Sequence, residues 1–125
     1  MIIRKSTLFQ LNELLGLNFT GKEQDWAIEF ADPERVKEFI GIAKLTQLSS
    51  AERYALLSLI LASYDEYLSE NIDDNNILWT DIVILLNNNP LLYNDLLNYW
   101  ALWNEESTNK LFLISPLIRN YLNNN

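Results

Sequence analysis

The sequence has 125 residues, the usual length of one domain, and 49% of them are hydrophobic, which is enough for one sizeable core. It contains no histidine and no cysteine, which excludes Ser-His-Asp and Cys-His catalytic systems, imidazole or thiolate metal sites, and disulfides. The net charge of −8 disfavours direct nucleic-acid binding, because a phosphate-binding surface needs clustered lysine and arginine residues.

The N-terminal quarter of the sequence predicts a short helix followed by a turn and a strand. Residues 7–10 fit a capping box, leucines then recur at helical spacing, and Gly16 is a suitable helix stop. Residues 26–30 change to the alternating period of a strand. A turn at residues 20–22 would fold this segment into a small β-hairpin within residues 17–31.

The middle of the sequence predicts two further helices. Asp32 followed by Pro33 is a strong helix start, because it places a capping side chain before a proline in the first turn. A second capping box spans residues 49–52 and opens a helix that runs to about residue 68. Residues 54–62 are apolar nearly all round, and a helix of that kind belongs at the centre of a fold.

The C-terminal half alternates short helices with polar connections. A polar, acidic connection covers residues 69–76, and a short apolar helix follows over residues 77–86. Pro90 and Pro116 each follow a capping residue and are each expected to start a helix. The polar residues 105–109 form the loop between those two helices.

These elements predict a single, mostly α domain over residues 1–125. We expect a compact bundle of five or six helices, with at most a small β-hairpin near residues 17–31, and short connections that leave consecutive helices antiparallel. The longest stretch without a charged residue covers residues 82–94. It is shorter than the roughly 20 apolar residues that span a membrane. We therefore expect a cytoplasmic protein that makes no contact with a membrane.

Charge is distributed unevenly along the chain. Residues 54–109 contain nine acidic residues and no basic one, so this stretch has a charge of −9 and the rest of the chain has +1. A field of this kind steers a basic partner, although acidity also serves solubility alone. Both explanations stay open at this point.

Two chemical uses of these carboxylates are disfavoured. Acid catalysis requires one carboxyl group shielded from water, whereas these groups fall at a helix end and in a polar loop. Residues 73–76 offer oxygen ligands for calcium, but they lack the glycine and the distal bidentate glutamate of the standard loop. We therefore expect no enzyme activity, no metal site and no cofactor.

The aromatic residues of the acidic stretch have two interpretations. Helical spacing favours burial of Tyr99, Trp100 and Trp103 in the core. The alternative is that one or two aromatic residues are exposed anchors for a partner, because Tyr and Trp are enriched in interfaces. The same two interpretations apply to Trp79 and Tyr93.

The acidic residues are expected to gather at one end of the molecule. In an up-down bundle, the connection after the helix over residues 50–68 and the loop after the helix over residues 90–103 lie at the same end, because two helix lengths separate them. Seven carboxylates would then form one partner-binding rim: Asp65, Glu66, Glu70, Asp73, Asp74, Glu105 and Glu106.

Three segments, residues 25–33, 92–100 and 112–119, resemble immunity proteins of bacterial polymorphic toxin systems, such as those of contact-dependent growth inhibition. The resemblance covers most of the chain in size and layout. It implies a cytoplasmic protein that binds one cognate toxin domain and blocks it. This family has no shared catalytic residues, so no site follows from the resemblance.

The acidic surface suggests that the toxin is a nuclease with a basic active-site groove. An acidic partner would be steered to such a groove and would occupy the place of the substrate phosphates. Two other functions stay open: an acidic adaptor or regulatory subunit of a permanent complex, and a nucleic-acid mimic that inhibits DNA-binding proteins.

Overall fold

The structure is a computed structural model that describes residues 1–71 and 77–124. Within these residues the chain forms seven α-helices and two short 3-10 helices, and no strand. The prediction of a mostly α fold is confirmed, whereas the expected count of five or six helices is too low. The elements are α1 (Lys5–Leu15), α2 (Trp26–Glu29), η1 (Pro33–Arg35), α3 (Val36–Leu45), α4 (Ser50–Glu70), α5 (Ile77–Asn88), α6 (Asn94–Ala101), η2 (Thr108–Lys110) and α7 (Ser115–Asn123).

The long helix α4 lies in the middle of the molecule, as predicted. It begins with the expected capping box, in which the Ser49 hydroxyl accepts a hydrogen bond from the Glu52 N–H and the Glu52 carboxylate accepts one from the Ser49 N–H. From Tyr54 to Tyr64 every side chain except Ser58 is buried. This helix therefore supplies the centre of the hydrophobic core.

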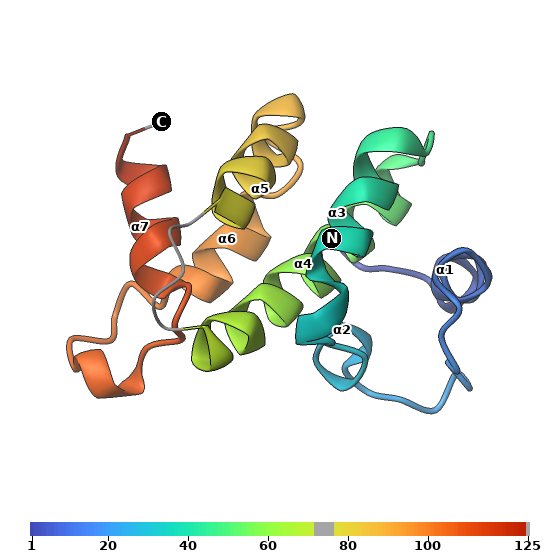
Figure 1. The fold of residues 1–125 in the computed structure, drawn as a ribbon, viewed down its shortest axis with the longest axis horizontal. Coiled ribbons are helices and arrows are strands. Elements are labelled where there is room, and N and C mark those ends of the chain that lie inside the picture. Colours follow the sequence, from blue (N-terminus) through green and yellow to red (C-terminus); the bar gives the residue numbers. More distant parts are fainter. Residues whose placement is uncertain (72–76, 125) are drawn as a thin grey trace.

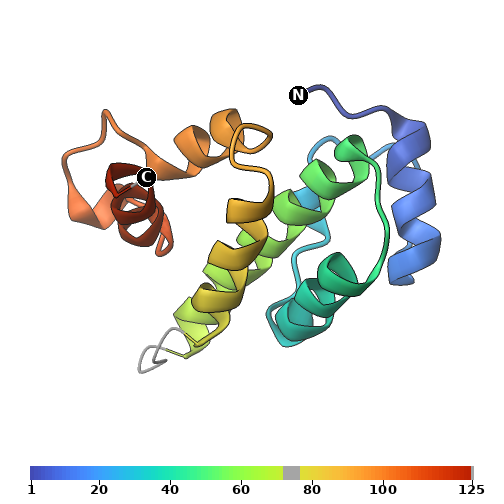
Figure 2. The ribbon, with the colours of Figure 1, turned by 90° about the horizontal axis from the view of Figure 1, so that it is seen from above.

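The other helices are arranged on two sides of α4 (Figures 1 and 2). Helices α1, α2 and α3 lie on one side, and α2 and α3 pack directly against α4. Helices α6 and α7 lie on the other side and pack against each other, and α5 lies between the two groups, where it packs against α3. None of the helices in the described ranges has the length and apolar character needed to cross a membrane.

The β-hairpin expected within residues 17–31 is not formed. Residues 26–29 instead make the single helical turn α2, because the side chains on both flanks cap it. The Asp25 carboxylate accepts a hydrogen bond from the Ile28 N–H (3.2 Å), and the Glu29 carboxylate accepts one from the Asp25 N–H (3.0 Å). Only Trp26 of this turn is buried, so the alternation of apolar residues does not describe one face of a strand.

Two helix starts also differ from the prediction. Helix α1 begins at Lys5, two residues before the expected capping box, although Gly16 ends it in the left-handed conformation (φ +66°) as predicted. Helix α6 begins at Asn94 and not at Pro90. Residues 89–92 form a turn closed by the Leu92 N–H and the Asn89 carbonyl oxygen (3.1 Å), which delays the helix.

Candidate functional site

Five of the seven acidic residues expected to bind a partner lie in the described part of the chain, in two separate segments. Asp65, Glu66 and Glu70 lie in the last turns of α4, and Glu105 and Glu106 lie in the loop between α6 and η2. Asp73 and Asp74 lie outside the described residues. Whether these groups bind one partner stays a prediction.

Asp65 is half-buried and is engaged inside the protein. Its Oδ1 atom accepts a hydrogen bond from the Ile114 N–H (3.0 Å). Burial raises the pKa of Asp65, and hydrogen bonds from the backbone of Ile114 and Leu113 partly oppose this shift. The bond brings the end of the α6–α7 connection to the C-terminal half of α4, and both views place them side by side (Figures 1 and 2). Asp65 therefore connects α4 to the start of α7, and its carboxylate is not free to bind a partner in the way an exposed one is.

Glu66 marks a region of concentrated negative charge at the end of α4. Its side chain is exposed, and its pKa is raised first by partial burial and then by the charges of Glu70, Asp65 and Asp32. Asp32 comes from the cap of η1, outside the acidic stretch of the sequence. Sequence reasoning treated Asp32 only as a helix cap, because nothing local indicates that it lies near α4.

Two acidic residues of the stretch are paired with positive charges. The Asp81 Oδ1 atom on α5 lies 2.9 Å from the Lys44 Nζ atom on α3. The Asp95 Oδ2 atom lies 2.6 Å from the N-terminal ammonium group of Met1, whose hydrogen bond lowers the pKa of Asp95. Positively charged groups from the first half of the chain thus form ion pairs with two acidic residues of the acidic stretch. Among the described residues of this stretch, the other five acidic residues form no ion pair: Asp65, Glu66, Glu70, Glu105 and Glu106.

The aromatic residues of the acidic stretch divide between core and surface. Tyr93 and Trp100 are buried, and Trp79 is half-buried. Tyr99 and Trp103 are 55% and 44% exposed, so the expectation that they are buried is wrong. The physical reason for Trp103 is that α6 ends at Ala101, and the next residue adopts a left-handed conformation that turns the chain away from the helix face.

Tyr99 and Trp103 border a shallow hollow of about 420 Å³ beside the end of α6, and Glu105 lies at its edge. Both rings are held in place. The Trp103 Nε1–H donates a hydrogen bond to the Asn98 Oδ1 atom (2.7 Å), and the centroid of the Tyr99 ring lies 6.0 Å from the centroid of the Phe112 ring. The hollow is therefore bordered by two exposed aromatic side chains and by Glu105.

Arg119 on α7 fixes the end of α6 and the start of the following loop. Its Nε–H donates to the Ala101 carbonyl oxygen (2.6 Å), and its Nη2 group donates to the carbonyl oxygens of Leu102 and Glu105. Its guanidinium group also lies over the Trp103 ring, 5.7 Å from the ring centroid. The C-terminal end of a helix carries partial negative charge, so a guanidinium group stabilises it. Sequence reasoning missed this residue.

An exposed aromatic side chain beside an acidic residue is suited to a positively charged side chain. Because Arg119 already lies over the Trp103 ring, Tyr99 is the ring of this pair that is left for such a contact. A lysine or arginine over a Trp or Tyr face is attracted by the ring quadrupole, by about 0.5–2 kcal/mol depending on desolvation. Glu105 supplies an opposite charge at the edge, although its carboxylate also accepts a hydrogen bond from the Ser107 N–H (3.1 Å). The hollow can therefore receive a basic side chain of another protein.

Neither a metal site in the described residues nor a similar protein indicates a function for the chain. Within residues 1–71 and 77–124, no three acidic residues are grouped so that they could hold a metal ion. The 73–76 segment considered for calcium lies outside these ranges. Comparisons of the chain with protein-family models, curated proteins and solved structures find no match.

Proposed function

We propose that the chain is a binding protein and not an enzyme, and that it neutralises a cognate bacterial toxin domain. The observation that carries this proposal is the hollow between the exposed rings of Tyr99 and Trp103, with Glu105 at its edge. Trp and Tyr are the residues most often found as anchors in protein interfaces. A fixed, exposed pair of them beside a carboxylate favours a partner that offers a lysine or arginine.

The resemblance to immunity proteins includes part of the same region of the chain. Two of the three similar segments, residues 92–100 and 112–119, pack against each other through the rings of Trp100 and Phe112, whose centroids lie 4.5 Å apart. Helix α6 and Arg119, which build and fix the hollow, belong to these two segments. The resemblance itself assigns no site, and Trp103 and Glu105 lie outside the similar segments, so the exposed aromatic pair alone carries the choice of surface.

A nuclease is the toxin class that this surface suits best. A nuclease groove carries lysine and arginine side chains for the substrate phosphates. One such side chain would enter the hollow, and the exposed carboxylates of Glu66, Glu70 and Glu106 would speed association by steering. The bound protein would then exclude the nucleic acid from the groove.

Co-expression tests the proposal directly. The chain is expressed with the toxin domain encoded by the neighbouring gene, and growth of the host is measured. We expect the wild-type chain to restore growth and the double variant Tyr99→Ala/Trp103→Ala to fail. The matched control is Leu45→Ala/Leu91→Ala, because both leucines are 89% exposed and lie outside the hollow. A wild-type chain that restores no growth would overturn the proposal, and a different protein bound permanently to the chain would favour the adaptor function.

A further inference from the structure

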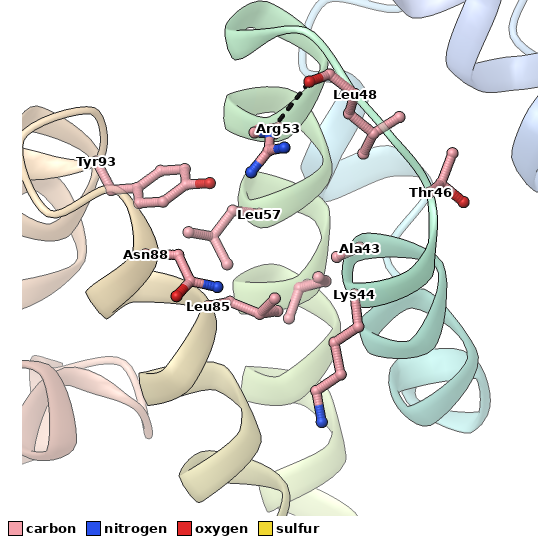
Figure 3. A pocket seen from close by; sticks show the side chains of 10 residues that line it. Ala43, Lys44, Thr46, Leu48, Arg53, Leu57, Leu85, Asn88 and Tyr93 are labelled. Atoms are coloured by element: carbon pink, nitrogen blue, oxygen red, sulfur yellow. Dashed lines mark hydrogen bonds between the residues drawn. The ribbon is translucent and has the colours of Figure 1, made fainter.

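A second, deeper cavity lies between α3, α4 and α5, away from the hollow (Figure 3). Its volume is about 160 Å³. Its floor is formed by Leu57, Ile60 and Leu85, which are all buried. Dry apolar cavities of about 150 Å³ hold one benzene-sized molecule, so this cavity accommodates a ligand of similar size.

Arg53 supplies a positive charge to this cavity. Its Nε–H donates a hydrogen bond to the Leu48 carbonyl oxygen (3.0 Å), which fixes the plane of the guanidinium group. The terminal nitrogen atoms extend into the cavity (Figure 3). They form no hydrogen bond or ion pair with any residue in the described part of the chain. Two parallel N–H donors on a fixed guanidinium plane match the two oxygens of a carboxylate.

Tyr93 supplies a neutral donor opposite Arg53. Its side chain is only 4% exposed, and its ring stacks on the Tyr54 ring with 6.5 Å between centroids. The Tyr93 hydroxyl group points towards Arg53 (Figure 3). Among the residues described, this hydroxyl group has no hydrogen-bond partner. Burial raises the pKa of Tyr93 while the Arg53 charge opposes the shift, so the hydroxyl group keeps its proton at neutral pH.

The other polar groups of the cavity add no competing charge. Lys44 points its ammonium group away from Arg53 and Tyr93 (Figure 3), and that group is paired with Asp81 on the outer side. The Asn88 side chain is exposed and lies at the rim. Among the residues that the structure describes, no acidic side chain lines the cavity, so Arg53 gives it a positive charge.

We infer that this cavity binds a small carboxylate with a short apolar body. The carboxylate accepts hydrogen bonds from the terminal N–H groups of Arg53 and from the Tyr93 hydroxyl, while the apolar body lies on Leu57, Ile60 and Leu85. Both parts are needed: an anion without an apolar body leaves the apolar floor uncovered, and a neutral molecule does not pair with the positive charge of Arg53. The inference does not depend on the proposed toxin binding, because the cavity and the hollow share no residue.

Titration of the full-length chain with butyrate, followed by NMR, tests the inference. We expect saturable shifts of the Arg53 Nε–H and of the backbone amides around Thr46. Butyramide, the neutral isostere, and inorganic phosphate, which lacks an apolar body, are expected to bind at least about tenfold more weakly. The variant Arg53→Gln should lose at least about tenfold in butyrate affinity, and Tyr93→Phe should lose severalfold.

The control is Lys37→Gln, which also removes one positive charge but lies on α3 outside the cavity, and it should bind butyrate like the wild type. If Arg53→Gln does not fold, Tyr93→Phe decides the test, because it keeps the ring that stacks on Tyr54. The inference would be overturned if Arg53→Gln, or Tyr93→Phe where Arg53→Gln does not fold, bound butyrate with the affinity of the wild type. It would also be overturned by equal binding of butyramide or phosphate, or by the absence of saturable binding by any probe, which would mean that the cavity holds only solvent.

Discussion

Arg119 should be the most sensitive single residue of the α6–α7 region, because it satisfies three carbonyl oxygens with one side chain. Replacing it with methionine keeps the apolar stem and removes the three hydrogen bonds to Ala101, Leu102 and Glu105. A hydrogen bond to a charged group contributes about 1.5–3 kcal/mol to stability. Three independent bonds would therefore give roughly 4.5–9 kcal/mol.

The expected loss is smaller than this sum, because Arg119 is only half-buried and water can reach the freed carbonyl groups. Such groups recover part of their hydrogen bonding from solvent, and losses above about 4–5 kcal/mol are exceptional for one substitution. We expect Arg119→Met to lower the free energy of unfolding by about 3 kcal/mol, or the melting temperature by roughly 12 °C. Arg119→Lys keeps the charge but not the planar fork and should lose about half as much.

Urea denaturation of both variants measures these losses. The matched control is Lys110→Met on η2, an exposed side chain whose replacement should change stability by less than about 0.5 kcal/mol. The Trp103 Nε1–H resonance should also broaden or shift in Arg119→Met, since the guanidinium group lies over this ring. A loss below about 1 kcal/mol with an unchanged Trp103 resonance would refute the role assigned to Arg119.

Replacing Ser49 with alanine removes half of the capping box of α4 and should cost about 1 kcal/mol in urea denaturation. Asp65 and Glu66 have raised pKa values in the folded state, so the folded chain binds protons more readily there than the unfolded chain. The contribution of these two groups to stability should therefore increase as the pH falls from 7 towards their ordinary pKa values of about 4, and Asp65→Asn should reduce this increase in thermal melts. Burial, and then the Asp95 charge, raises the pKa of Tyr54 to about 12. Its contribution to stability is complete below about pH 10 and lost as the pH rises to about 12, so Tyr54→Phe should reduce the alkaline loss.

Sequence patterns predicted the elements whose causes lie within one or two helical turns. The capping box of α4 needs only Ser49 and Glu52, and the end of α1 needs only Gly16 in a left-handed conformation. The central place of α4 followed from the apolar residues 54–62, because no face of that segment can remain exposed to water at low cost.

The features that the sequence did not predict depend on groups distant in the chain or on competing local caps. Residues 26–30 alternate like a strand, but the Asp25 side chain caps them as a helical turn. The exposure of Trp103 follows from the end of α6, which Arg119 fixes from 18 residues away. Asp65 is engaged by the backbone of Ile114, 49 residues away, and no pattern in the sequence indicates that contact.

A pair of matched variants separates the effect of the acidic residues near the hollow on binding from the effect of the total charge. Glu105→Lys/Glu106→Lys reverses the charges of Glu105, which lines the hollow, and of its exposed neighbour Glu106. Glu13→Lys/Glu34→Lys reverses two exposed charges on α1 and η1. Both variants change the net charge by the same amount. Charges at the rim of an interface act mainly on association rate and salt dependence, so only the first variant should slow binding strongly.

The most direct test of the proposed function is the association rate of these two variants with the toxin domain encoded by the neighbouring gene, measured by stopped flow at low and high salt. The account predicts that Glu105→Lys/Glu106→Lys slows association about tenfold or more at low salt, that the difference narrows at high salt, and that Glu13→Lys/Glu34→Lys stays within about twofold of the wild type. Equal association rates for the two variants at low salt would contradict it, and the acidic residues at the hollow would then serve solubility alone.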